Sequence, residues 1–266
     1  MNEIRKYSCI FSMSFKTQSI YKLSVIFNII SCVCKLFIQI NIWKSLISSN
    51  AKNSISLKDM CLYIVVNMLV LCLVNIDVSK YIEDNVRDGS ISTYLVRPMS
   101  YKYYLFFDAI GKNVFTMTFT ILPVVIITAM FIGIPFPEYA MQYLITLLFI
   151  IIGILISFEL SYIIGLFAFW LQTSWFLKFY INGAITLFGG TAVPLWFYPK
   201  ALRGICNFLP FRYITFEAIN YYLNDYGISA DIIHKLIIGI VWILLLKVTG
   251  HIIWKLSLKK LSVNGG

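Results

Sequence analysis

Long apolar runs alternate with short polar segments along almost the whole chain. Most of the runs reach the roughly 20 apolar residues that an α-helix needs to cross a bilayer. The pattern therefore predicts an all-α membrane protein with six transmembrane helices. The predicted spans cover residues 23–47, 57–79, 104–134, 139–170, 179–199 and 232–254.

The first 20 residues carry an amphipathic pattern instead of a continuous apolar one. Ile4, Tyr7, Phe11 and Phe15 recur at helical spacing, while the basic residues fall between them. Such a helix lies in the headgroup plane with its apolar face toward the lipid tails. Residues 1–20 are therefore expected to form an interfacial helix on the cytoplasmic side.

Residues 80–103 form the densest polar segment and separate the second predicted span from the third. Charges at this density cannot lie in hydrocarbon, so the segment is expected outside the bilayer. Asp88-Gly89 can end one helix, Ser90 can cap the next, and Pro98 ends it again. The sequence thus predicts a short helix over 91–96.

This short helix would place Ile91, Tyr94 and Leu95 on one face, because they are three and four residues apart. We expect that apolar face to fit a groove of a partner protein. An ordinary solvated loop is the alternative.

The segment after the fifth run, residues 200–228, contains two amphipathic pieces split by Pro210. Irregular backbone at membrane depth persists only where it is packed against protein. Helices that enter and return on the outer side are therefore expected at 201–208 and 211–223.

A few polar side chains fall inside the predicted spans. Asn67 and Asn75 are typical of hydrogen bonds between helices. Glu159 needs a basic or hydroxyl partner, such as Lys35 or a tyrosine, because a carboxylate is costly in lipid. A contact with a transported substrate is the functional alternative for Lys35, Asn67, Asn75 and Glu159. Pro123 is expected to kink the third span.

Composition agrees with a membrane protein, since 59% of the 266 residues are hydrophobic and 13% are charged. The net charge of +10 does not indicate nucleic-acid binding, because the basic residues flank the apolar runs. Lysine and arginine are more frequent on the face that carries 80–103 and both termini, which predicts that this face is cytoplasmic. The six scattered cysteines are expected to be buried thiols.

Catalytic motifs are missing from the sequence. It contains no G-x-x-x-x-G-K-[ST] phosphate loop, no H-E-x-x-H zinc motif and no G-x-S-x-G nucleophile motif. No catalytic residue, metal site or cofactor is therefore expected in this chain, and it is not expected to be an enzyme. Any energy for its activity would come from another protein.

Two groups of motifs resemble those of ABC-2 type permeases, the membrane subunits of ATP-binding cassette exporters. The first is Asp88-Gly-Ser-Ile-Ser-Thr-Tyr-Leu-Val-Arg-Pro98. The second contains Phe169-Trp-Leu-Gln-Thr-Ser-Trp175, Gly189-Gly-Thr-Ala-Val-Pro194, Phe197-Tyr-Pro199 and Leu209-Pro-Phe-Arg-Tyr213. The resemblance covers nearly the whole chain and keeps the order of the motifs.

The resemblance implies a permease subunit in a bacterial cell membrane that exports a hydrophobic or amphipathic substrate such as a peptide, drug or lipid. It implies two copies of a separate ATPase subunit, which bind ATP and Mg, and a second permease subunit that is identical or paralogous. The 80–103 segment would dock on the ATPase. The residues implied in this docking are Glu83, Arg87, Gly89, Ile91, Tyr94, Leu95, Arg97 and Pro98.

Two other classes of function remain as alternatives. A transporter or channel driven by an ion gradient would need paired intramembrane charges or an internal repeat of spans. A membrane-embedded enzyme would need metal or nucleophile spacings. The sequence shows none of these features clearly.

Overall fold

The computed structural model describes residues 3–49, 57–132, 139–171, 173–224 and 230–260. Every regular element in these ranges is helical. The longer helices are α1 (Glu3–Gln18), α2 (Lys22–Ser49), α3 (Leu57–Val74), α4 (Ser79–Arg87), α6 (Tyr101–Thr116), α7 (Leu122–Ile132), α8 (Ala140–Leu166), α9 (Trp175–Phe188), α10 (Lys200–Phe208), α11 (Phe216–Leu223) and α12 (Ala230–Lys260). The short elements are α5 (Ile91–Leu95), η1 (Met117–Ile121), η2 (Phe167–Phe169), η3 (Leu195–Phe197) and η4 (Pro210–Tyr213).

Five helical segments are long and apolar enough to cross a bilayer, so the chain is a multi-pass membrane protein. They are Lys22–Ser48, Leu57–Arg87, Tyr101–Met130, Ala140–Phe169 and Asp231–Lys260. The segment predicted as the fifth span contains α9, which has only 14 residues. At 1.5 Å per residue, α9 extends about 21 Å, less than the hydrocarbon thickness of about 30 Å. The count of six spans therefore stays a prediction.

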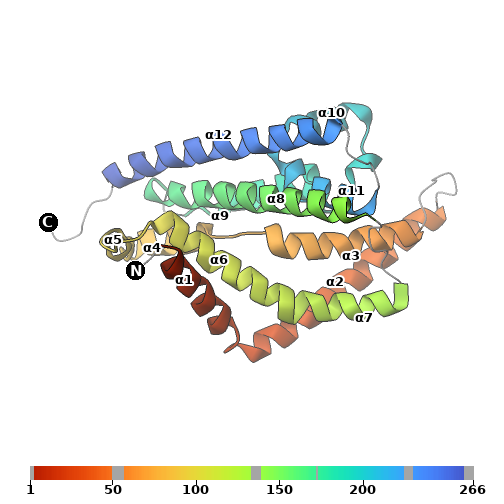
Figure 1. Ribbon diagram of the computed structural model, residues 1–266, viewed down its shortest axis with the longest axis horizontal. Coiled ribbons are helices and arrows are strands. Elements are labelled where there is room, and N and C mark those ends of the chain that lie inside the picture. Colours follow the sequence, from red (N-terminus) through yellow and green to blue (C-terminus); the bar gives the residue numbers. More distant parts are fainter. Residues whose placement is uncertain (1–2, 50–56, 133–138, 172, 225–229, 261–266) are drawn as a thin grey trace.

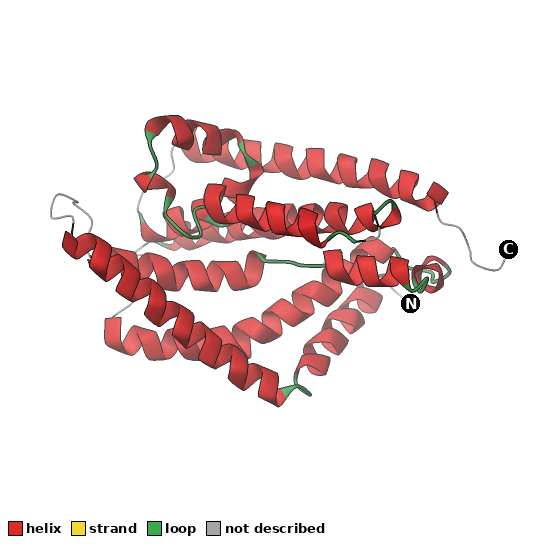
Figure 2. Cartoon of the chain, turned by 180° about the vertical axis from the view of Figure 1, so that it is seen from behind, coloured by secondary structure: helices red, strands yellow, loops and turns green. Residues whose placement is uncertain are grey.

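α8 forms the centre of the bundle and contacts α3, α4, α11 and α12 (Figure 1). Its buried face includes Phe149 and Ile156, which belong to one core cluster with residues of α3, η4 and α11. α2 lies obliquely across the back of the bundle (Figure 2). α2 and α12 expose most of their apolar side chains, as expected of helices that face lipid.

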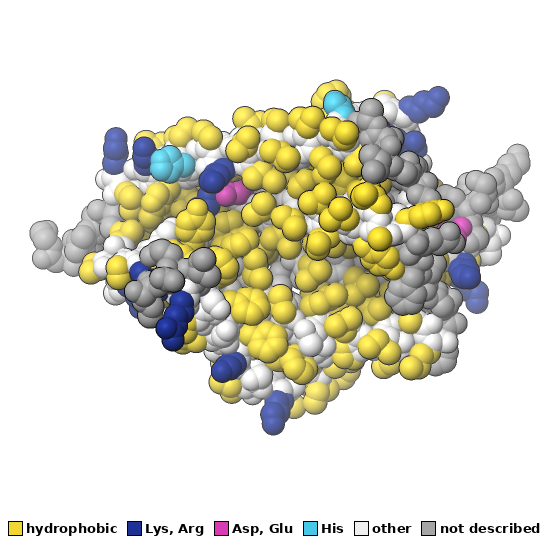
Figure 3. All heavy atoms as spheres, in the orientation of Figure 1, with side chains coloured by type: hydrophobic (Ala, Val, Ile, Leu, Met, Phe, Trp, Pro, Cys, Tyr) yellow, Lys and Arg dark blue, Asp and Glu magenta, His cyan; other side chains and the backbone are white. Residues whose placement is uncertain are grey.

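The face of the molecule in Figure 3 is largely hydrophobic, and most of its charged side chains lie toward its two ends. α1, α4, α5 and the C-terminal end of α12 gather at one of these ends (Figure 1). α10 and α11 lie toward the other. Below, these are called the α5 end and the α10 end.

Two spans are not continuous α-helices. α3 ends at Val74, five residues before the predicted end of the second span, and an irregular stretch of residues 75–78 separates it from α4. In the third span the π-helical turn η1 directly precedes α7, whose second residue is Pro123. Proline has no N–H to donate to the preceding turn, which explains why the regular α-helical pattern is interrupted at the expected place.

The expected helices of the 200–228 segment are present as α10 and α11, with Pro210 between them in η4. Residues 225–228 lie outside the described residues. α11 returns against α8, where the rings of Tyr221 and Phe149 stack at 5.1 Å between centroids. The buried Arg212 is paired with Glu217, so neither charge is left alone in the interior.

The close contact between α8 and η4 depends on Gly153. A Cβ atom at this position would lie 2.5 Å from the carbonyl oxygen of Ile214. Gly153→Ala is therefore expected to force the two backbones apart and to destabilise the protein by about 1–3 kcal/mol, the usual range for overpacking. Thermal unfolding in detergent measures this effect.

Gly183→Ala on α9 is the matched control, because no atom lies within 4 Å of the added Cβ. Alanine in a helix is otherwise favoured over glycine by about 0.5–1 kcal/mol. A melting temperature for Gly153→Ala at or above that of the control would contradict the proposed role of Gly153.

Candidate functional site

The helix α1 packs along α6, so its apolar face is covered by protein. The ring of Tyr7 stacks on Phe107 at 5.2 Å, and Phe15 meets Phe115 edge to face at 5.4 Å. Ser14 donates a hydrogen bond of 2.5 Å to Asp108. α1 thus lies beside the start of the third span, next to α5.

α4 and α5 form a helical hairpin at the α5 end of the bundle. The turn between them contains Gly89 at a φ of +75°, a conformation that glycine adopts without strain. Hydrogen bonding from Ser90 lowers the pKa of Asp88. The expected N-cap is wrong, because the Ser90 hydroxyl donates to Asn85 at 3.1 Å instead of capping α5.

The apolar face of α5 is largely used by the chain itself. Ile91 is fully buried, and the ring of Tyr94 lies 5.3 Å from the rings of Tyr101 and Tyr104. The Tyr94 hydroxyl also shares a hydrogen bond of 2.5 Å with Tyr81. The prediction that this face is left open for a partner is therefore wrong for Ile91, whereas Tyr94 is half-buried against the first turns of α4 and α6.

The rim of the hairpin remains accessible. Val96 is 86% exposed and Leu95 is 37% exposed, so two apolar side chains point away from the core. The exposed residues around them are Arg87, Asp88, Gly89, Arg97 and Pro98. The hairpin thus presents a small apolar surface edged by charge of both signs. Glu83 lies apart from this rim and accepts two hydrogen bonds from Ser174, at 3.0 Å from its N–H and 2.5 Å from its hydroxyl.

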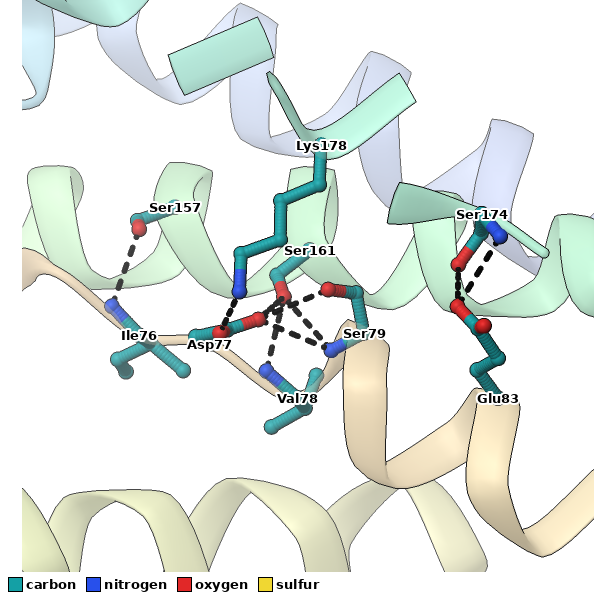
Figure 4. Close-up of polar contacts among 9 residues, drawn as sticks. All are labelled: Ile76, Asp77, Val78, Ser79, Glu83, Ser157, Ser161, Ser174 and Lys178. Atoms are coloured by element: carbon teal, nitrogen blue, oxygen red, sulfur yellow. Dashed lines mark hydrogen bonds and ion pairs between the residues drawn. The ribbon is translucent and has the colours of Figure 1, made fainter. Parts of the chain in front are cut away.

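The irregular stretch of residues 75–78 is held by hydroxyl groups of α8 (Figure 4). Ser157 accepts the N–H of Ile76 at 3.2 Å. Ser161 accepts the N–H of Val78 at 2.8 Å and that of Ser79 at 3.1 Å. These hydroxyls replace the carbonyl acceptors that the N–H groups would have in a continuous helix.

The carbonyl groups at the break are satisfied from the opposite side. The Asn113 side chain of α6 donates to the carbonyl oxygen of Leu73 at 3.3 Å and to that of Asn75 at 3.1 Å. The break therefore has partners on both α6 and α8. A buried backbone group without a partner costs about as much as a lost hydrogen bond, so this pairing allows the helix to stop within the bundle.

Asp77 connects the break to α9. Its carboxylate accepts the Ser79 hydroxyl at 2.8 Å and forms an ion pair with Lys178 (Figure 4). A cavity of about 180 Å³ adjoins this pair and is lined by residues of α8, α9 and the break. The start of α9 is thereby linked to α4 through Glu83 and Ser174, and to the break before α4 through Asp77 and Lys178.

α4 also lies very close to α8. A Cβ atom at Gly165 would lie 2.7 Å from the side chain of Ile82 and 3.0 Å from Cα of Ser79. Ile82 is fully buried at this contact. Together with the hydroxyl contacts at the break, this packing joins the α4–α5 hairpin to the central helix of the bundle.

The basic partner expected for Glu159 is present, but it is Lys102 of α6, at 2.7 Å, and not Lys35. Lys35 is exposed on α2. The Lys102 ammonium also lies 4.9 Å from the centroid of the Tyr162 ring. The first turn of α6 thus neutralises the buried carboxylate of α8.

Of the two asparagines, Asn67 bonds to another part of the bundle through its side chain, as expected, whereas the hydrogen bond at Asn75 involves its backbone carbonyl. Asn67 donates to the carbonyl oxygen of Thr191 at 3.0 Å, and the carbonyl oxygen of Asn75 accepts from Asn113. Lys35, Asn67, Asn75 and Glu159 therefore lie at separate places in the described structure. Their role in a substrate pathway stays a prediction.

The sequence analysis did not predict that the hydroxyl groups of Ser157 and Ser161 bind the backbone at residues 76–79. Below, this pairing is called the clamp. Ser157 and Ser161 are four residues apart on the face of α8 that also carries the buried Gly165. This small-residue spacing in an otherwise bulky span was the available signal, but it does not identify the backbone groups that the hydroxyls bind. Among the described residues, no group of three or more His, Cys, Asp or Glu side chains is arranged to hold a metal ion.

A protein-family model described as "ABC-2 family transporter protein" matches residues 29–265. The match includes both interrupted spans, the α4–α5 hairpin and the α10–α11 segment. No curated protein matches the sequence.

Removing the hydroxyl of Ser161 tests the clamp. Ser161→Ala leaves the N–H group of Val78 without its acceptor, which costs about 1–3 kcal/mol, while the N–H of Ser79 keeps only its bond to Asp77 at 3.3 Å. We expect a lower melting temperature and faster hydrogen exchange at residues 76–79. Ser12→Ala on the exposed side of α1 is the control and should change neither. Unchanged exchange at the break in Ser161→Ala would contradict the role of this hydroxyl.

Removing Lys102 tests the buried ion pair. Lys102→Met leaves the Glu159 side chain, which is 8% exposed, without its counter-ion and should destabilise the protein by about 3–5 kcal/mol. Adding Glu159→Leu should restore most of this loss, because no buried charge is then left alone. Lys112→Met is the control; its pair with Asp108 is more exposed, and its loss should cost about 1 kcal/mol or less. Failure of the double variant to recover would exclude an uncompensated charge as the cause.

Proposed function

Because the chain belongs to the ABC-2 transporter family, we propose that it is the permease subunit of an ATP-binding cassette exporter. In this proposal it moves a substrate outward with the energy of ATP hydrolysed by a separate subunit, which also binds Mg. The match over residues 29–265 is the observation that carries the proposal. ABC-2 permeases normally work with an ABC ATPase.

The α4–α5 hairpin is the proposed docking site for the ATPase. It stands at one end of the bundle and exposes Leu95 and Val96 between Arg87 and Arg97. Apolar residues surrounded by charge are typical of protein interfaces. Ile91 and Tyr94 would fix the shape of the hairpin from inside, while the exposed rim, including Gly89 and Pro98, would touch the partner.

Movement of the hairpin would reach the spans through the contacts of α4. Its start is held on α8 by Ser161 and Gly165, and Glu83 and Asp77 tie it to Ser174 and Lys178 at the beginning of α9. A pull by the ATPase on α4 would therefore shift α8 and α9 together. Rigid-body shifts of packed helices are an established means of switching between two states.

The remaining parts have proposed roles that agree with their positions. α1 contacts the segment that follows α5, where Lys6 donates to the carbonyl oxygen of Pro98 at 3.4 Å, and would form a second contact with the ATPase. The α10–α11 segment would close the exit at the outer face, with both termini on the cytoplasmic face. A second permease subunit, identical or paralogous, would complete the pathway, and two ATPase subunits would drive it. The substrate is proposed to be hydrophobic or amphipathic, such as a peptide, drug or lipid, because the spans expose chiefly apolar and aromatic side chains.

Transport driven by an ion gradient is the competing function. The buried ion pair of Lys102 and Glu159 is compatible with it, but a single neutralised pair does not form a chain of titratable groups across the membrane. Reconstituted vesicles containing the permease and its ATPase distinguish the two. ATP-dependent export without an ion gradient supports the exporter, whereas uptake driven by a proton or sodium gradient without ATP supports the competitor.

The docking site is tested with Val96→Asp, which changes an 86% exposed side chain and should leave the fold intact. The wild-type chain, co-expressed with an ABC ATPase encoded next to it, is expected to retain that ATPase during purification. Placing a charge in the apolar part of the interface should reduce the retained ATPase about tenfold or more. Quantitative gel analysis of the purified complex measures the ratio of the subunits.

Tyr139→Asp is the matched control, because Tyr139 is also exposed and precedes α8 at the opposite end of the bundle. It should retain the ATPase like the wild type. Equal retention by Val96→Asp and the control would contradict docking at the hairpin, and absence of ATPase from the wild-type preparation would contradict the exporter itself.

A further inference from the structure

A large groove lies between α12 and the segment that joins α5 to α6. Its volume is about 780 Å³, within the range of ligand-binding sites. One wall consists of residues of α12, both aliphatic and basic, and the opposite wall consists of Tyr94, Leu95 and the first residues of α6. In Figure 3 basic, acidic and histidine side chains occur near α12 among hydrophobic ones toward this end of the molecule.

The groove lies where one surface of the bilayer is expected. α12 has 31 residues and is about 46 Å long, so it is longer than the hydrocarbon core of about 30 Å. The span predicted over 232–254 ends three residues after His251, which places His251 and Lys247 in its last two turns, near the boundary with the headgroups.

The groove carries one lysine whose charge is not balanced. Lys102 lines it but is paired with Glu159. Lys247 lines it as well, and the ion pairs found among the described residues include none to Lys247. His251 is one helical turn further along α12 and faces the same groove. The local charge therefore favours an anion beside an apolar wall.

We propose that this groove binds an anionic phospholipid from the leaflet at the α5 end. Lys247 and His251 would hold the phosphate, and the acyl chains would lie along Leu244, Val248 and Ile252. A phospholipid combines the required negative charge and apolar chains, and a membrane supplies it at this depth. Because Tyr94 and Leu95 form the opposite wall, the bound lipid would lie directly against α5.

Gly250 permits the close approach of α12 at the floor of this groove. A Cβ atom there would lie 3.3 Å from Oε2 of Glu159. The paired rings of Tyr101 and Trp254, 5.8 Å apart, join α6 to α12 at the end of the groove. The walls are therefore fixed by packing in the protein alone, and the lipid would enter a site that already exists. The proposal does not depend on an ATPase partner.

Binding is tested with the full chain purified in a zwitterionic detergent. Phosphatidylglycerol is added as the probe, and bound lipid is counted by native mass spectrometry. Phosphatidylcholine with the same acyl chains tests the contribution of the net negative charge, and soluble glycerol phosphate tests that of the acyl chains. We expect clear binding of phosphatidylglycerol and much weaker binding of the other two.

Lys247→Gln should weaken phosphatidylglycerol binding about fivefold, as expected for one basic residue near an anionic membrane surface. Lys247→Arg should retain it, because it keeps the charge. Lys259→Gln, on the same helix but outside the groove, is the matched control and should bind like the wild type. An unchanged melting temperature shows that the Gln variants are folded; if Lys247→Gln is not, Lys247→Met replaces it.

A second measurement is the effect of the lipid on hydrogen exchange. This effect would not depend on Lys247 if the lysine had only a structural role. Phosphatidylglycerol should slow exchange over residues 91–96 in the wild type and in Lys259→Gln but not in Lys247→Gln. Equal binding by Lys247→Gln and the wild type would overturn the proposal. So would equal affinity for phosphatidylcholine, or glycerol phosphate binding as tight as that of the lipid.

Discussion

Backbone groups at membrane depth must find partners inside the protein, because hydrocarbon offers none. The structure meets this requirement at the break in the second span, and the same kind of pairing occurs at the turn after α9. At residues 75–78 the partners are Ser157, Ser161 and Asn113. After α9, the carbonyl oxygens of Gly189 and Gly190 accept hydrogen bonds from Thr215 at 2.6 Å and Tyr63 at 2.6 Å. Side chains from neighbouring helices thus replace the missing helical hydrogen bonds at both places.

This requirement also connects distant parts of the chain. The break after α3 cannot exist without α6 and α8, and the turn after α9 depends on α3 and on the segment between η4 and α11. Each interruption therefore serves as a fixed contact between spans. A displacement of α4 would be passed to α8 and α9 through groups whose separation is costly. Through these contacts, the proposed docking of an ATPase on the hairpin would move helices within the membrane.

Buried charges near the α5 end likewise need a partner inside the protein. Glu159 is tolerated in α8 because Lys102 approaches it from the first turn of α6. Lys247, on the opposite wall of the same groove, receives no such partner among the described residues. Lys102 therefore has a structural role in an ion pair, whereas the charge of Lys247 makes the groove favourable for an anionic lipid. Both arise from the packing of α6 and α12 against α8.

The sequence alone determined the all-helical membrane class, the short helix α5, the two short helices around Pro210 and the interruption near Pro123, because these depend on local hydrophobicity and on the backbone limits of glycine and proline. It also indicated that Glu159 needs a basic partner. Only the tertiary structure decided that this partner is Lys102, that Ile91 is buried, and that the second span breaks at residue 75. These features depend on contacts between residues far apart in the chain, which periodicity within one helix does not encode.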